Sequence, residues 1–112
     1  MKDKLFNKLW KDALSQPQKE LFLNEYGYPD WFDEISQDPS EVMDTLRKIH
    51  DVAHMSMRDI INTAKLSQTS FADKFCIPLR TVQNWCTEAA GQRKCPDYIR
   101  LAVCRQLGIL EV

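Results

Sequence analysis

The sequence predicts an all-α protein, and three observations support this fold class. Only three glycines and five prolines occur in 112 residues, too few for the frequent turns of a β-sandwich or barrel. Apolar residues recur along most of the chain with the helical period of about 3.6 residues. Hydrophobic residues make up 44% and charged residues 28%, as in folded domains rather than disordered chains. We therefore expect helices around a modest core.

The N-terminal part predicts two amphipathic helices and a short helical turn. The first helix carries one apolar stripe, formed by Leu5, Phe6, Leu9, Trp10, Ala13 and Leu14. Pro17 is expected to open the second helix, which carries Leu21, Phe22 and Tyr26 and ends at Gly27. Pro29 starts the short turn, which bears Trp31, Phe32 and Ile35. We expect most of these aromatic rings in the core and some at an interface.

Two capping patterns predict the next helix starts. Asp38-Pro39-Ser40-Glu41 combines a capping aspartate, a proline at the first helical position and a glutamate three residues after the cap. It starts a helix through about Ala53. Ser56-Met57-Arg58-Asp59 repeats the signature and starts a helix that carries Ile60 and Ile61.

Short helices with close boundaries follow. Ser67 caps a helix, Cys76-Ile77-Pro78 forms a tight turn, and the next helix extends from Leu79 to about Thr87. Pro96 opens a last helix through Leu107, which Gly108 stops. Two short helices joined by a three-residue turn predict a helix-turn-helix.

The side chains meet the packing demands of that motif. Ala72 is the small residue expected where the two helices cross, and Ile77 is the apolar plug of the turn. In the second helix we expect Val82 and Trp85 to face the core. The polar side chains then point away from it: Arg80, Thr81, Gln83 and Asn84.

This segment resembles the Cro and phage-repressor type of helix-turn-helix domain, the xenobiotic-response-element family. The pattern is Leu66-Ser67-Gln68-x-x-Phe71-Ala72-x-x-Phe75-Cys76-Ile77-Pro78-x-x-Thr81-Val82-x-x-Trp85. It follows the family's Leu-Ser-Gln, Leu-Ala, Gly-Val/Ile-Ser, Thr-Ile and Trp positions, and the resemblance covers residues 56 to about 107. It implies a lambda-repressor-like helix-turn-helix domain preceded by an N-terminal helical extension.

The chain departs from the family pattern at two places. Cys76 stands where the family usually has glycine, at a turn position often found at positive φ. The family's Glu-x-Gly after the tryptophan is replaced by the longer Cys86-Thr87-Glu88-Ala89-Ala90-Gly91. The path of the loop before Arg93 is therefore left open.

The resemblance implies that residues 79–87 form a recognition helix in the major groove of DNA. Its side chains would then read bases: Arg80 can pair with guanine, and Asn84 or Gln83 with adenine. Leu79 and Thr81 can contact a thymine methyl. Gln68, at the start of the preceding helix, would bind a DNA phosphate, and Arg93 and Lys94 would contact the DNA backbone.

Charge divides the chain into two parts. Residues 1–55 hold 7 Lys and Arg against 11 Asp and Glu, a net charge of −4, whereas residues 56–112 hold 8 against 5, a net charge of +3. We expect residues 1–55 to be a helical extension for dimerisation or partner binding and residues 56–112 to be the DNA-binding domain.

Several other classes are disfavoured. The four cysteines, Cys76, Cys86, Cys95 and Cys104, lack a Cys-x-x-Cys pair, so we expect reduced and mostly buried thiols. His50 and His54 have metal-ligand spacing but no evident third ligand, and we interpret them as surface or interface residues. No carboxylates are organised around a nucleophile, so we expect no enzyme activity, no metal and no cofactor. The sequence shows no apolar run long enough to span a bilayer and no apolar run typical of a signal peptide at its N-terminus. We therefore expect a cytoplasmic protein that binds no membrane.

The sequence thus predicts a sequence-specific transcriptional regulator, a repressor that binds double-stranded DNA as a homodimer. The N-terminal helices and the last helix are the candidate dimer contacts. Two alternatives stay open. One is an antitoxin-like autoregulator that binds a protein partner through residues 1–55, and the other is a protein-interaction adaptor on a helix-turn-helix scaffold.

Overall fold

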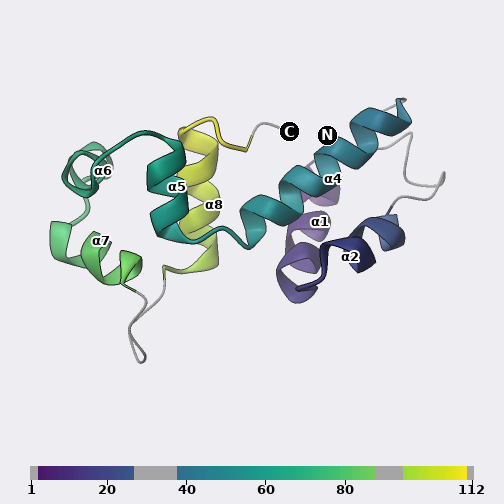
Figure 1. Ribbon diagram of the computed structural model, residues 1–112, viewed down its shortest axis with the longest axis horizontal. Helices are drawn as coiled ribbons and strands as arrows, with labels where there is room; N and C mark the ends of the chain where they lie inside the picture. The colour runs from purple at the N-terminus through teal and green to yellow at the C-terminus, as the bar shows by residue number, and fades with distance from the viewer. Residues whose placement is uncertain (1–2, 27–37, 88–94, 111–112) are drawn as a thin grey trace. The chain divides into compact units, whose positions relative to one another are not determined.

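A computed structural model describes residues 3–26, 38–87 and 95–110. Within these ranges the regular structure consists of seven helices and no strand, which confirms the all-α prediction (Figure 1). The predicted helical turn at residues 29–35 lies outside the described residues. The chain divides into two compact units, Met1–His54 and Met55–Glu111, next to the boundary expected from the change in charge.

The first unit contains α1 (Asp3–Ser15), α2 (Lys19–Tyr26) and α4 (Pro39–Ala53), and α4 packs against both of the others (Figure 1). Its apolar core consists of Phe6, Leu9, Trp10, Ala13, Phe22, Leu23, Tyr26, Val42, Leu46, Ile49, Val52 and Ala53. Each large side chain here contributes about 1.5–3 kcal/mol by leaving water. Tyr26 also keeps its hydroxyl paired, because it donates to the Asp12 carboxylate.

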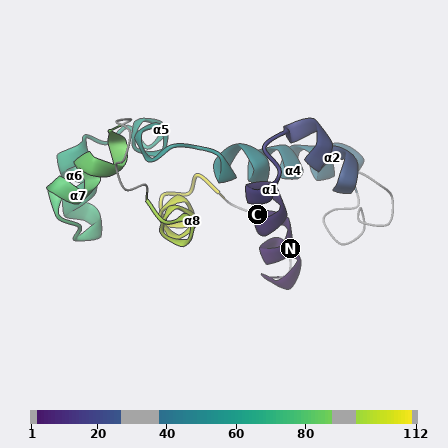
Figure 2. The same ribbon diagram turned by 90° about the horizontal axis from the view of Figure 1, so that it is seen from below.

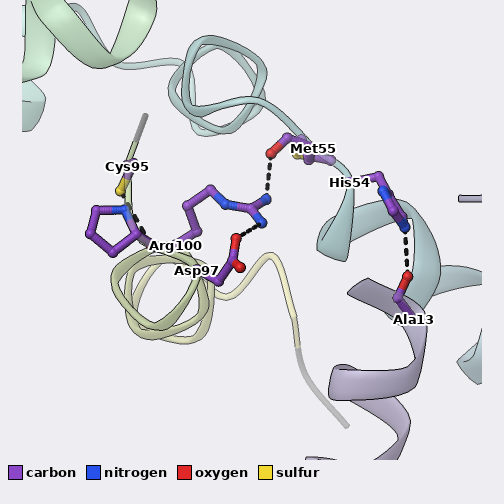
Figure 3. A network of polar contacts seen from close by, with 7 residues as sticks. Ala13, His54, Met55, Cys95, Asp97 and Arg100 are labelled. Atoms are coloured by element: carbon purple, nitrogen blue, oxygen red, sulfur yellow. Dashed lines mark hydrogen bonds and ion pairs between the residues drawn. The ribbon is translucent and has the colours of Figure 1, made fainter. Parts of the chain in front are cut away.

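His50 of α4 and His54, its C-cap residue, contact the junction between α1 and α2. Pro17 has no N–H, so the Ala13 carbonyl four residues earlier lacks its helical donor. His54 Nε2 lies 2.6 Å from this carbonyl (Figure 3), and His50 Nε2 lies 2.7 Å from the carbonyl of Gln16. Since a carbonyl oxygen only accepts hydrogen bonds, Nε2 of each histidine is the donor. The two rings, 4.4 Å apart, therefore cap the end of α1.

This arrangement corrects two expectations. His50 is not a surface residue, since it is only 4% exposed. The second helix starts at Lys19, two residues beyond Pro17, because the Gln18 N–H donates to the Gln16 side chain and the Gln18 carbonyl accepts from Phe22 N.

The second unit contains α5 (Met57–Thr63), α6 (Gln68–Phe75), α7 (Leu79–Cys86) and α8 (Asp97–Gln106). Helix α7 packs against α5 and α6, and Figure 2 shows α6 and α7 side by side from a second direction. The core consists of Met57, Ile60, Ile61, Phe71, Ala72, Val82, Cys86, Cys95, Val103, Cys104 and Leu110.

Arg100 attaches α8 to the start of this unit. Its Nη1 donates to the Met55 carbonyl and its Nη2 to Asp97 Oδ1, both at 2.7 Å (Figure 3). The side chain of Arg100 is only 11% exposed, so these hydrogen bonds satisfy a guanidinium that has lost most of its water.

Helices begin at the capping residues that the sequence predicts. The side chains of Asp38, Ser56 and Ser67 accept hydrogen bonds from the backbone N–H of Ser40, Asp59 and Ser70, respectively. Each bond satisfies one of the amides that a helix start leaves without an internal partner. Pro96 directly precedes α8, also as predicted.

Three helices of the second unit end in the same way. After α5, α6 and α8 one residue has a positive φ: Lys65 at 58°, Cys76 at 54° and Gly108 at 73°. The residue that follows each of them donates to the carbonyl five positions earlier, as Ile77 N does to Ala72 O at 2.9 Å. This is the Schellman motif, which usually has glycine in the left-handed position.

Candidate nucleic-acid interface

The turn between α6 and α7 consists of residues 76–78 and is defined by the backbone of Cys76. Its φ of 54° and ψ of 40° lie in the left-handed region, the conformation for which the family usually has glycine at this position. The Cys76 and Ile77 amides donate to the carbonyls of Asp73 and Ala72. Two eight-residue helices are thus joined by a turn with fixed hydrogen bonds.

Ala72 in α6 is buried, whereas Ile77 in the turn is only half-buried. Ala72 is 3% exposed and Phe71 is fully buried, so this face of α6 lies in the core. That Ile77 fills the turn stays a prediction, because its side chain is only half-buried. Gln68 is half-buried as the first residue of α6, and Thr69 beside it is exposed. Thr69 is a further polar candidate, which the sequence pattern did not single out because it falls on a variable position.

Helix α7 separates a buried from an exposed face. Val82 and Cys86 are buried, whereas Arg80, Gln83 and Asn84 are exposed. Leu79 is 37% exposed, and Thr81 is half-buried. The structure therefore presents a guanidinium and two carboxamides on the side of α7 that faces away from the core.

Trp85 differs from its prediction, because it is half-buried instead of buried. Val82 and Cys86 are one turn apart and form the centre of the buried stripe. At about 100° per residue, Trp85 lies about 60° from Val82 on the other side from Cys86. Its ring therefore lies at the edge of the core.

The N-termini of α6 and α7 differ in charge from the other described helices. Helices α1, α2, α4, α5 and α8 each carry an acidic residue in the first turn, whereas α6 and α7 carry none. Pro78 also provides no side-chain hydrogen bond to the first amides of α7. The positive end of each helix dipole is thus free of the carboxylates that would repel a phosphate.

Two predicted backbone contacts, Arg93 and Lys94, lie outside the described residues. The structure brings Arg80, Gln83 and Asn84 together on one helix, and Gln68 starts the neighbouring one.

Three of the four cysteines are buried in the described part of the chain. Cys86, Cys95 and Cys104 are buried, Cys76 is exposed, and all four are free thiols. Burial raises the pKa of Cys95 to about 12 and that of Cys104 to about 11, so these thiols remain protonated at neutral pH. Among residues 3–26, 38–87 and 95–110, no three His, Cys, Asp or Glu side chains gather as metal ligands.

None of the helices described here is long and apolar enough to cross a membrane. No protein-family model, curated protein or solved structure matches the chain. Function is therefore inferred from the side chains and backbone of α6 and α7.

Proposed function

We propose that this chain is a sequence-specific transcriptional regulator that binds double-stranded DNA through a lambda-repressor-like helix-turn-helix, with α7 in the major groove. The observation that carries the proposal is the exposed face of α7. It offers Arg80, Gln83 and Asn84 and contains no carboxylate, while Val82 and Cys86 hold the opposite face in the core. A short polar helix anchored in this way fits the groove of B-DNA.

Each exposed side chain has a base contact that its chemistry favours. Arg80 can donate two hydrogen bonds to guanine O6 and N7. Asn84 or Gln83 can both donate to and accept from adenine. Leu79 and Thr81 can contact a thymine methyl. A good bidentate contact discriminates against the wrong base by about 1–3 kcal/mol.

Other residues would position the protein on the phosphate backbone. Gln68 and the first amides of α6 and α7 lie at helix ends without a first-turn carboxylate, where a phosphate is favoured. Arg93 and Lys94 are proposed to contact the backbone from the segment after α7. Because the net charge of residues 56–112 is only +3, non-specific binding should be weak and should fall further with salt.

We propose a homodimeric repressor, because a single helix-turn-helix reads few base pairs. Two copies would read half-sites about one helical turn apart.

Selection of binding sites from a random double-stranded DNA library tests the proposal. The wild-type protein should enrich a palindromic site. Asn62→Ala removes an exposed amide from α5 and should enrich the same site, whereas Gln83→Ala combined with Asn84→Ala should not. Failure of the folded wild-type protein to enrich any sequence would refute the proposal and favour a protein-interaction adaptor. Co-purification of a small basic protein would favour an antitoxin-like autoregulator.

A further inference from the structure

An apolar groove lies beside the turn that joins α6 to α7. It has a volume of about 520 Å³ and lies between the end of α6 with its turn and one face of α8. Half-buried Phe75 and Ile77 line it from one side, and half-buried Ile99 and buried Val103 line it from the other. These side chains form an apolar floor, which favours a ligand with an apolar body.

Exposed polar side chains form the rim of the groove. Lys74, Tyr98 and Gln106 line it and are exposed. Lys74 forms no ion pair within the described part of the chain, and none of the described residues that line the groove is acidic. The rim therefore offers an ammonium, a phenol hydroxyl and a carboxamide to an anion, and no described carboxylate of the lining repels it.

The size of the groove favours a small molecule over a protein partner. Eight described residues line it, whereas a stable protein–protein interface has about 20–30 residues on each side. Its volume of about 520 Å³ lies within the range of about 300–1,000 Å³ that is usual for small-molecule sites. Lining, charge and size thus indicate the same class of ligand, a small apolar anion.

The groove lies next to the helix-turn-helix but leaves its exposed polar face open. Phe75 and Ile77 flank Cys76, the left-handed residue that ends α6. No residue of α7 is among the described residues that line the groove. A ligand held here therefore contacts the end of α6 and α8 without covering the side chains proposed to read DNA.

We propose that this groove binds a small apolar monocarboxylate, an aryl or alkyl carboxylic acid in its ionised form. The apolar body lies on Phe75, Ile77 and Ile99, and the carboxylate pairs with the Lys74 ammonium at the rim. The Tyr98 ring, which is 74% exposed, packs against the ligand and shields part of it from water. This site goes beyond the proposed function and does not depend on it, because no residue assigned to DNA lines the groove.

A ¹H–¹⁵N NMR titration of the full chain with biphenyl-4-carboxylate tests the site. A ligand of about 15 non-hydrogen atoms with ordinary binding efficiency should have a Kd of about 0.5 mM or below. The amide signals of residues 74–77 and 98–106 should shift and saturate, and those of α2 should stay in place. Biphenyl-4-carboxamide has the same shape without the charge and should bind about two- to five-fold more weakly, because it lacks an exposed ion pair.

Two variants locate the ligand in the groove. Lys74→Gln should raise the Kd of the carboxylate about two- to five-fold and leave that of the carboxamide unchanged. Ala102→Phe places a ring in the groove and should raise both Kd values beyond the range of the titration. The matched control is Lys48→Gln, which removes an exposed lysine from α4 and should change neither Kd. All three side chains are exposed, so the variants should melt like the wild type.

Three results would overturn the inference. They are the absence of saturating shifts at ligand concentrations well above 0.5 mM, equal Kd values for the carboxylate and the carboxamide, and an unchanged Kd of the carboxylate in Lys74→Gln or Ala102→Phe. Selection of DNA sites is independent of this titration. A protein that binds the carboxylate as expected but enriches no DNA would refute the proposed function alone, and a DNA-binding protein without saturating shifts would refute the ligand site alone.

Discussion

Replacing Cys76 by glycine should stabilise the turn between α6 and α7. Cys76 holds φ at 54° and ψ at 40°, a conformation in which the Cβ of an L-residue crowds the following carbonyl. Its amide and that of Ile77 are committed to hydrogen bonds with the end of α6, so the backbone cannot relax without losing them. Glycine has no Cβ and keeps both bonds.

The magnitude follows from two opposing terms. A left-handed residue with a Cβ costs about 1–2 kcal/mol. Glycine also increases the conformational entropy of the unfolded chain, which lowers the free energy of unfolding by about 0.4–1 kcal/mol. The expected net effect of Cys76→Gly is an increase of about 0.5–1 kcal/mol in the free energy of unfolding of the second unit.

Urea unfolding followed by circular dichroism measures this change as a higher midpoint at constant slope. Cys76→Ala is the matched control, because it removes the thiol and keeps the Cβ, and should change the free energy of unfolding little. Lys65→Gly, at φ 58° after α5, should give a gain similar to that of Cys76→Gly. If Cys76→Gly lowers the stability, or if Cys76→Ala raises it equally, the strain argument is wrong.

The remaining predictions concern the cores and the thiols. Phe71→Ala should cost about 3–5 kcal/mol because this ring is fully buried, and Trp85→Ala should cost clearly less in the same urea experiment; equal losses would show that the indole is buried. His50→Leu keeps the volume but leaves a part-buried carbonyl without its donor, so thermal unfolding should report a loss of about 1 kcal/mol or more. An unchanged melting temperature would rule out this cap. In a thiol-labelling assay of the native protein, Cys76 should react fast and the other three cysteines slowly. Burial raises the pKa of Cys95 to about 12 from an ordinary value of 9.0. The protonated thiol therefore contributes its full share to the free energy of unfolding below about pH 9, and this contribution should fall as the pH rises from 9 towards 12.

Local signals predicted much of the fold because they act within one turn of helix. The capping roles of Asp38, Ser56 and Ser67 depend on residues two or three positions away, and the structure has each as predicted. The positive φ of Cys76 could also be expected, because the resemblance placed a glycine there.

Contacts between distant segments could not be predicted in this way. His50 reaches a carbonyl 34 residues earlier in the chain. Pro17 indicates locally that the Ala13 carbonyl lacks a helical donor, but no short-range pattern indicates that His54 supplies one. Trp85 fits the helical period of a core residue, but it lies about 60° from Val82 at the edge of the buried stripe and is half-buried. Lys65 takes a left-handed conformation that its residue type does not favour.

The candidate site was predictable to the extent that it depends on the phase of one helix. Burial of Val82 places Arg80, Gln83 and Asn84 on the exposed side of α7, as expected. The absence of first-turn carboxylates in α6 and α7 could be recognised only from the structure, because the helix boundaries define which residues belong to the first turn.

The most direct test of the central claim, that α7 reads DNA sequence, is to repeat the binding-site selection with Arg80→Ala. If Arg80 contacts one guanine in each half-site, the variant should lose the base preference at that position, keep it at the others, and bind the original site more weakly by about 1–3 kcal/mol. An equal loss of affinity on every sequence, or an unchanged base preference at all positions, would contradict the account.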